Sequence, residues 1–200
     1  TVQFLMIKWK LVDFHAGNLF VAFVDLRAAF DLVLRHWLWK VLKSKGVPEN
    51  LFDIIIHLHQ ENYAQVRWRP PGELTGKISV DRGICQGCAL PPTLFLLYIN
   101  DCIPFLTNCS RDAPMLAGEK IPALFFAEDT LVLSKMAKGL QTLLEKFSIF
   151  CDEYCLEVNV SKTKYMVYNK HKKFGARLHW VHVPWRRLRN LTIWDSGRCI

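Results

Sequence analysis

Two adjacent carboxylates interrupt an apolar stretch in the second half of the chain, and this pattern constrains the fold most. Residues 121–126 are almost entirely apolar, Glu128 and Asp129 follow, and residues 131–133 are apolar again. Two short apolar strands around a polar pair are typical of a β-hairpin. The sequence therefore predicts a hairpin that carries two carboxylates at its tip.

A third carboxylate ends another apolar run. Residues 19–24 combine β-branched and aromatic side chains without a polar interruption, which predicts a buried strand that ends at Asp25. Hard divalent cations prefer carboxylate oxygens, and two of them about 4 Å apart can drive phosphoryl transfer. Asp25, Glu128 and Asp129 are thus candidate metal ligands. The alternative is that Asp25 caps the next helix and the acidic pair is an ordinary turn.

Periodicity predicts the remaining elements and an α+β fold. An amphipathic helix is expected from Phe30 to Leu42, stopped by Gly46 and Pro48. A second helix is expected over residues 50–60, with one apolar face formed by Leu51, Ile54, Ile55 and Leu58. The other expected elements are strands at 63–68 and 78–80, a helix at 91–100, a polar loop at 108–120, a helix whose inward residues run from 140 to 151, and a strand at 165–168.

Composition excludes some classes of protein and leaves others open. Of the 200 residues 51% are hydrophobic and 22% charged, which excludes a disordered chain. No apolar run approaches the roughly 18 residues that span a bilayer, so no membrane partner is expected. Residues 161–200 contain 10 basic residues and 1 acidic residue, against 16 and 17 in residues 1–160. Such a tail predicts contact with phosphate or anionic lipid, or else a solvated end.

Seven cysteines without a secretory signal predict reduced thiols and a nuclear or cytoplasmic, intracellular location rather than secretion. Two pairs, Cys85 with Cys88 and Cys151 with Cys155, have a spacing that could supply zinc ligands. Buried thiols are the favoured interpretation, because free cysteine is commonly a core residue and the second pair lies in a helical pattern.

Four blocks resemble, in order, those of reverse transcriptases from non-LTR (LINE-type) retrotransposons. They read VAFVDLRAAFD at 21–31, GICQGCALPPTLF at 83–95, FAEDT at 126–130 and LEVNVSKTK at 156–164. The resemblance covers about residues 19–169. It implies a partial right-hand polymerase fold, a palm with part of the fingers, in which helices pack an antiparallel sheet that carries the acidic hairpin. The implied boundaries are residues 1–170 for this domain and 171–200 for a basic, aromatic-rich tail without family resemblance.

The resemblance also implies a site and partners. Catalysis and the binding of Mg²⁺ or Mn²⁺ would fall to Asp25, Glu128 and Asp129, and the partners would be an RNA template, a DNA primer and dNTPs. The sugar would lie on Phe30, the template and nucleotide would contact Gln86 and Gly87, and the triphosphate would lie near Lys162. From the residues alone, Phe30 is equally in phase with a helix core face and Lys162 could be a solvated charge.

Departures from the family blocks predict impaired activity. Glu128 stands where the family has Asp, and Cys85 stands where it has Arg. The chain also begins without Met and lacks the primer-grip pattern, so a truncated copy is expected. The alternative function is a decayed remnant that retains at most non-specific nucleic-acid binding. The tail residues that would bind are Lys170, Lys172, Lys173, Arg177, Arg186, Arg187 and Arg189.

Overall fold

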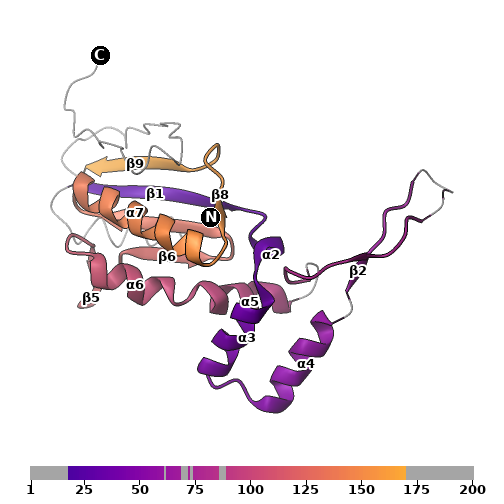
Figure 1. Cartoon of the computed structure of the whole chain (residues 1–200). Coiled ribbons are helices and arrows are strands. Elements are labelled where there is room, and N and C mark those ends of the chain that lie inside the picture. The colour runs from indigo at the N-terminus through magenta and orange to yellow at the C-terminus, as the bar shows by residue number, and fades with distance from the viewer. Residues whose placement is uncertain (1–17, 61, 69–71, 73, 86–88, 170–200) are drawn as a thin grey trace.

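The computed structural model describes residues 18–60, 62–68, 72, 74–85 and 89–169. Its centre is an antiparallel five-stranded sheet formed by β1 (Asn18–Arg27), β6 (Ala123–Phe126), β7 (Asp129–Ser134), β8 (Glu157–Val158) and β9 (Lys164–Asn169). Strand β1 pairs with β7 along one edge and with β9 and then β8 along the other. This central position gives β1 hydrogen-bonding partners on both sides (Figure 1).

The two faces of β1 enter two apolar clusters. Phe20, Ala22 and Val24 belong to the large core, whereas Leu19 and Val21 pack with Leu131 and Leu133 on the other face. A strand buried on both faces has no need for polar alternation. Burial on both faces thus explains the apolar residues 19–22 and Val24, whereas Phe23 is exposed.

Helices contribute many of the buried residues of the large core. Helix α7 (Ala137–Glu153) packs against β1 and β7, α6 (Cys102–Cys109) packs against α7, and α5 (Leu90–Ile99) packs against α3 (Arg35–Ser44). Figure 1 shows α7 lying across the sheet. The predicted inward residues of α7 are all buried, and they are Leu140, Leu143, Leu144, Phe147 and Cys151.

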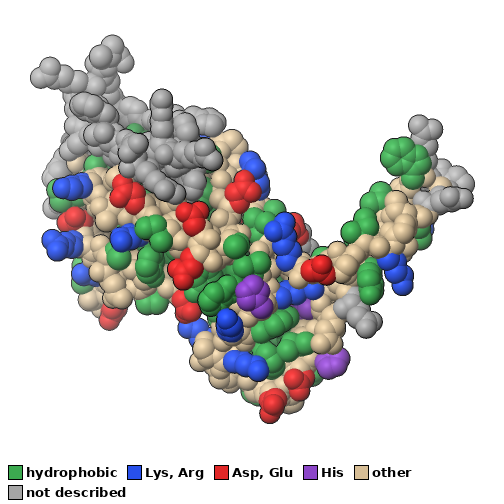
Figure 2. Space-filling view, viewed as in Figure 1, with side chains coloured by type: hydrophobic (Ala, Val, Ile, Leu, Met, Phe, Trp, Pro, Cys, Tyr) green, Lys and Arg blue, Asp and Glu red, His purple; other side chains and the backbone are tan. Residues whose placement is uncertain are grey.

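A second region projects away from the sheet. Helix α4 (Glu49–His59) leads into the two short strands β2 (Tyr63–Ala64) and β3 (Ile78–Ser79) (Figure 1). We call α4, β2, β3 and the described residues between them the arm. A bridge between Arg67 and Leu74 extends the strand pairing beyond β2 and β3. Hydrophobic side chains lie exposed along this hairpin (Figure 2), and Trp68 is 72% exposed.

The predicted α+β class and partial palm fold are confirmed, but several boundaries differ. Strand β1 runs past Asp25 to Arg27, so Asp25 lies within the strand. The single helix expected over residues 30–42 is split into α2 (Ala29–Leu32) and α3, because Val33 and Leu34 are extended and the Val33 carbonyl accepts the Gly83 N–H. Sequence reading also missed α6, β8 and the small hairpin of β4 (Met115–Leu116) and β5 (Glu119–Lys120).

The apolar face of α4 was also predicted only in part. Of the residues expected on one face, Ile55 is buried, whereas Leu51, Ile54 and Leu58 are exposed. Phe52 and His59 complete the buried side instead. Apolar residues occupy so much of this helix that periodicity alone does not select the side that meets the core.

One stretch is apolar enough to be compared with a membrane span. Residues Leu90–Cys109, which comprise α5 and α6, pass by length and composition with a mean hydropathy of 1.2. Their apolar side chains enter the large core, among them Leu94, Phe95, Tyr98, Ile99, Cys102 and Leu106. Core packing accounts for part of this composition, since Leu96 and Ile103 of the same stretch are exposed. The expected lack of a membrane partner stays a prediction.

Candidate active site

The acidic hairpin forms as predicted. Phe126 pairs with Asp129, so the loop between β6 and β7 consists of only Ala127 and Glu128. Ala127 has a φ of 50°, and a positive φ at the first loop position is typical of two-residue hairpins. Asp129 therefore opens β7 while Glu128 lies in the turn itself.

The sheet register places two of the predicted carboxylates face to face. Asp25 of β1 is the cross-strand partner of Asp129 of β7. Directly opposed residues in antiparallel strands have Cβ atoms roughly 4.5–5.5 Å apart, so their side chains interact. The two aspartates come from positions 104 residues apart in sequence and are brought together by strand pairing alone.

The electrostatic environment of Asp129 includes both of the other predicted carboxylates. Partial burial raises the pKa of Asp129 above its usual value, and the nearby charges of Glu128 and Asp25 raise it further. Like charges held close together favour the protonated form of one of them. A divalent cation would relieve this repulsion, so the charge arrangement suits a cation with oxygen ligands.

The fit to a metal is good for the two aspartates and incomplete for Glu128. Among the residues that the structure describes, no three His, Cys, Asp or Glu side chains are grouped so that they could hold a metal ion. Glu128 thus adds negative charge without completing a three-carboxylate cluster. Asp25 and Asp129 are the residues whose register and chemistry fit Mg²⁺ or Mn²⁺.

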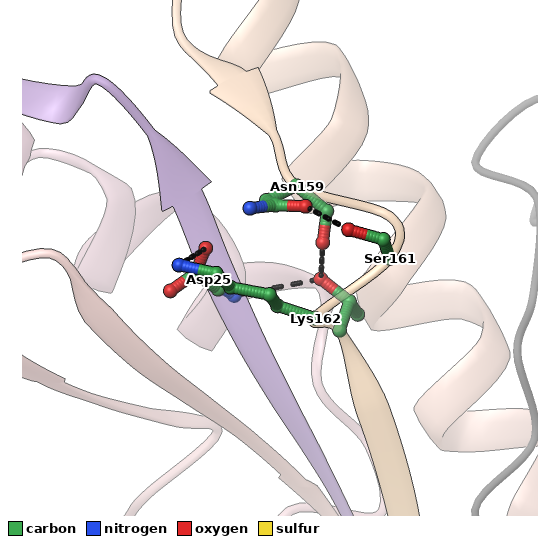
Figure 3. Close-up of polar contacts among 5 residues, drawn as sticks. Asp25, Asn159, Ser161 and Lys162 are labelled. Carbon is green, nitrogen blue, oxygen red and sulfur yellow. Dashed lines mark hydrogen bonds and ion pairs between the residues drawn. The ribbon is translucent and has the colours of Figure 1, made fainter.

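The fourth family block, residues 156–164, contacts Asp25 through hydrogen bonds to its backbone (Figure 3). The Asn159 N–H donates to the Asp25 carbonyl at 2.8 Å, and the Asp25 N–H donates to Thr163 Oγ1 at 3.4 Å. The Thr163 hydroxyl in turn donates to the Asn159 carbonyl at 2.9 Å, and Ser161 Oγ donates to Asn159 Oδ1 at 2.7 Å. The turn between β8 and β9 therefore holds the backbone of Asp25 through both of its polar groups.

Lys162 lies in the same turn and reaches the carboxylate itself. Its Nζ is 3.9 Å from Asp25 Oδ2, while its own side chain is 69% exposed. An exposed pair at this distance contributes little to stability. The contact nevertheless places a cation beside the predicted metal-binding carboxylates, so Lys162 is a member of the site.

Phe30 has mainly a packing environment. It is half-buried against the large core, with its ring centroid 5.3 Å from that of Phe95 on α5. Its carbonyl accepts the Ile84 N–H at 2.9 Å, which connects α2 to the start of the second family block. The role of Phe30 in sugar contact stays a prediction.

Several predicted site residues lie outside the described part of the chain. These are Gln86, Gly87 and the tail residues Lys170, Lys172, Lys173, Arg177, Arg186, Arg187 and Arg189. Cys88 is also among the undescribed residues. The favoured interpretation of buried thiols is wrong for Cys85 and Cys155, which are exposed, and is confirmed for Cys151. Burial raises the pKa of the Cys151 thiol, as expected for a core cysteine.

Comparison with known proteins agrees with the fold and the arrangement of the blocks. The family model described as reverse transcriptase (RNA-dependent DNA polymerase) matches residues 3–182. The chain belongs to the reverse transcriptase family. It is a domain of the type found in non-LTR retrotransposons, because its relatives are Pol polyproteins of R2 retrotransposable elements.

Two relatives show the extent of the likeness. The polyprotein from the type-1 element R2 of Popillia japonica is 29% identical over 143 residues, covering 72% of this chain and 20% of the relative. That of Nasonia vitripennis is 26% identical over 182 residues, covering 81% of this chain and 16% of the relative. The chain thus spans about a fifth or less of the length of these relatives.

Solved structures support the same fold. Apo telomerase from Candida tropicalis, truncated from its C-terminal domain, matches with a TM-score of 0.60 and 16% identity, covering 87% of this chain and 35% of that one. Telomerase from Candida albicans in complex with a telomeric RNA fragment matches with a TM-score of 0.61 and 16% identity, covering 82% and 31%. At this identity the likeness concerns the fold alone.

Proposed function

We propose that this chain is the catalytic palm of an RNA-directed DNA polymerase, which adds dNTPs to a primer 3′-hydroxyl on an RNA template. The observation that carries the proposal is the opposed pair Asp25 and Asp129, which lie on β1 and β7, two neighbouring strands inside the sheet. We further propose that polymerisation by this chain is impaired.

Each residue has a distinct part in the proposed reaction. Asp25 and Asp129 would hold the divalent cations, and Mg²⁺ or Mn²⁺ bound there supplies activation of the 3′-hydroxyl and neutralisation of the leaving group. The turn from Asn159 to Thr163 fixes Asp25 by its backbone, so its carboxylate is presented from a rigid strand. Lys162 brings positive charge beside the carboxylates, where a triphosphate would approach.

Glu128 is the proposed cause of the impairment. It keeps the negative charge of the family Asp but adds one methylene, and it forms no three-carboxylate group within the described residues. In-line transfer tolerates little displacement, because a 1 Å error in a reacting group costs on the order of 10²-fold in rate. Glu128→Asp is therefore expected to increase incorporation by up to about that factor.

Primer extension on a homopolymer RNA template with a DNA primer tests this proposal. We expect weak Mg²⁺- or Mn²⁺-dependent extension by the unmodified chain, stronger extension by Glu128→Asp, and loss of extension in Asp25→Asn and Asp129→Asn. Asp53→Asn is the matched control, since this exposed aspartate lies on α4 in the arm. Extension that survives in either site variant, or silence of folded Glu128→Asp protein, overturns the catalytic proposal.

A remnant that only binds nucleic acid is the alternative, favoured by the concentration of 10 basic residues in residues 161–200. The structure sharpens its test, because β9 and Lys162 belong to the sheet region and should be kept. Deleting residues 170–200 leaves the described sheet complete. The alternative predicts salt-sensitive RNA binding that this deletion abolishes and that Asp25→Asn leaves unchanged. Binding that survives the deletion contradicts it.

A further inference from the structure

The guanidinium of Arg35 connects α3 with the end of α4 and with residues 82–83. Arg35 opens α3, and its Nε donates to the Gly83 carbonyl at 2.8 Å. Its Nη1 donates to the carbonyl of His59, the last residue of α4, at 2.8 Å, and its Nη2 donates to the Arg82 carbonyl at 3.4 Å. A planar fork of fixed donors suits several carbonyls at once, which the single ammonium of lysine does not.

The segment that Arg35 holds is packed directly on α2. The Gly83 N–H donates to the Val33 carbonyl at 2.8 Å, and the Ile84 N–H donates to the Phe30 carbonyl at 2.9 Å. Gly83 has a φ of +83°, and a side-chain carbon there would lie 2.9 Å from the Asp31 carbonyl oxygen. No residue larger than glycine fits this contact without displacement of the backbone. Residues 83–84 and 30–33 thus form one backbone junction.

We infer that Arg35 is a positioning residue, which fixes Phe30 by locking residues 82–84 against α2. Phe30 lies five residues after Asp25 on the same continuous segment, and its contacts include the Ile84 hydrogen bond to its carbonyl and the packing of its ring on Phe95. Because Arg35 binds the Gly83 carbonyl while Val33 binds the Gly83 N–H, loss of the guanidinium frees one side of the junction. The inference rests on the proposed function and on the sugar contact that the family resemblance implies for Phe30.

Amide hydrogen exchange gives the first test and needs no activity. In Arg35→Gln we expect the Gly83 and Ile84 amides to exchange about tenfold faster or more, since charge-assisted hydrogen bonds to their segment are lost. The Leu133 amide, which donates to the Pro122 carbonyl within the sheet region, should be unchanged. Arg111→Gln is the matched control, because Arg111 is exposed in the loop after α6. Unchanged exchange at residues 83 and 84 overturns the inference.

Nucleotide kinetics gives the second test, run on the chain and on Glu128→Asp. We expect Arg35→Gln to raise the KM for dNTP more than it lowers kcat, and to reduce the preference for dNTP over rNTP by at least about threefold. Arg35→Lys keeps the charge and one donor group, so its KM and its preference for dNTP should lie between those of the parent chain and of Arg35→Gln. A merely structural role would lower the amount of active protein without changing sugar preference. If the parent chains extend primers and the sugar preference is unchanged in Arg35→Gln, the inference is wrong while the proposed function stands. If neither parent chain extends primers, the proposed function is wrong, and so is the role of Arg35 in positioning a sugar contact.

Discussion

The sheet region and the arm use apolar residues in opposite ways. In the sheet region, most residues of β1 are buried, in clusters on both of its faces, and the predicted inward residues of α7 all lie in the core. In the arm, Trp68, Ile54 and Leu58 are all more than half exposed. The two regions therefore differ in how much of the free energy of unfolding each supplies, although both are rich in apolar side chains. Apolar sequence alone does not reveal this difference.

The largest expected effect is the loss of stability on truncating a buried aromatic residue of the sheet region, compared with an exposed aromatic residue of the arm. Phe147 on α7 is fully buried and its ring faces Phe125 at a centroid distance of 6.4 Å, so Phe147→Ala should lower the free energy of unfolding by about 3–5 kcal/mol. Trp68→Ala should change it by no more than about 0.5 kcal/mol, because nothing is uncovered. Urea unfolding followed by circular dichroism measures both. Equal losses would break the comparison between the two regions.

A smaller effect is expected where the two regions meet. Gly83 and Gly46 both have positive φ, at +83° and +74°, but only Gly83 has backbone atoms within 4 Å of where a side chain would begin. Gly46→Ala should cost about 1–2 kcal/mol from conformation alone. Gly83→Ala should cost measurably more, because the Asp31 backbone must also move. Thermal unfolding of the two variants measures both losses, and their difference is the cost of the close contact at Gly83. Equal losses would show that the Asp31 backbone moves without cost to accommodate a side chain at position 83.

Much of the sheet region was predictable because its signals are local. The apolar runs around residues 19–24 and 121–133 and the helical spacing of α7 each follow from neighbouring residues. The extension of β1 through Asp25 was not predictable in this way, because its partner Asp129 is distant in sequence. The break between α2 and α3 likewise depends on a hydrogen bond from Gly83 to Val33. These features depend on tertiary contacts rather than on propensity.

The candidate site also combines features that local sequence predicts with features that depend on tertiary contacts. The carboxylates at the hairpin tip could be predicted, since residue type and position carry the chemistry. Thr163 and Arg35 were missed because both act on backbone groups, which every residue possesses. A pattern of side chains contains no signal for such contacts. The family blocks located Lys162, although its pairing with Asp25 became visible only in the structure.

The smallest expected effect is a change in thermal stability on replacing Asp129, a residue of the sheet region whose ionised form the fold disfavours. Partial burial and the charges of Glu128 and Asp25 raise the pKa of Asp129, so the fold disfavours its ionised form. At pH 7, where Asp129 is ionised, Asp129→Asn should therefore raise the midpoint of thermal unfolding slightly. The gain should shrink as the pH falls through the raised pKa, and it should vanish below the ordinary value of 3.8, where Asp129 is protonated in both the folded and the unfolded chain.

Differential scanning fluorimetry across pH 3–8 measures this gain, with Asp53→Asn of the arm as the control that should leave the midpoint unchanged. Addition of Mg²⁺ should raise the midpoint of the unmodified chain at pH 7 and so narrow its gap to Asp129→Asn, because a bound cation removes the same repulsion. A midpoint that falls in Asp129→Asn at pH 7 would mean that the opposed carboxylates stabilise the sheet. Asp25 and Asp129 would then be a structural pair and not a site whose charge repulsion is retained for binding a cation.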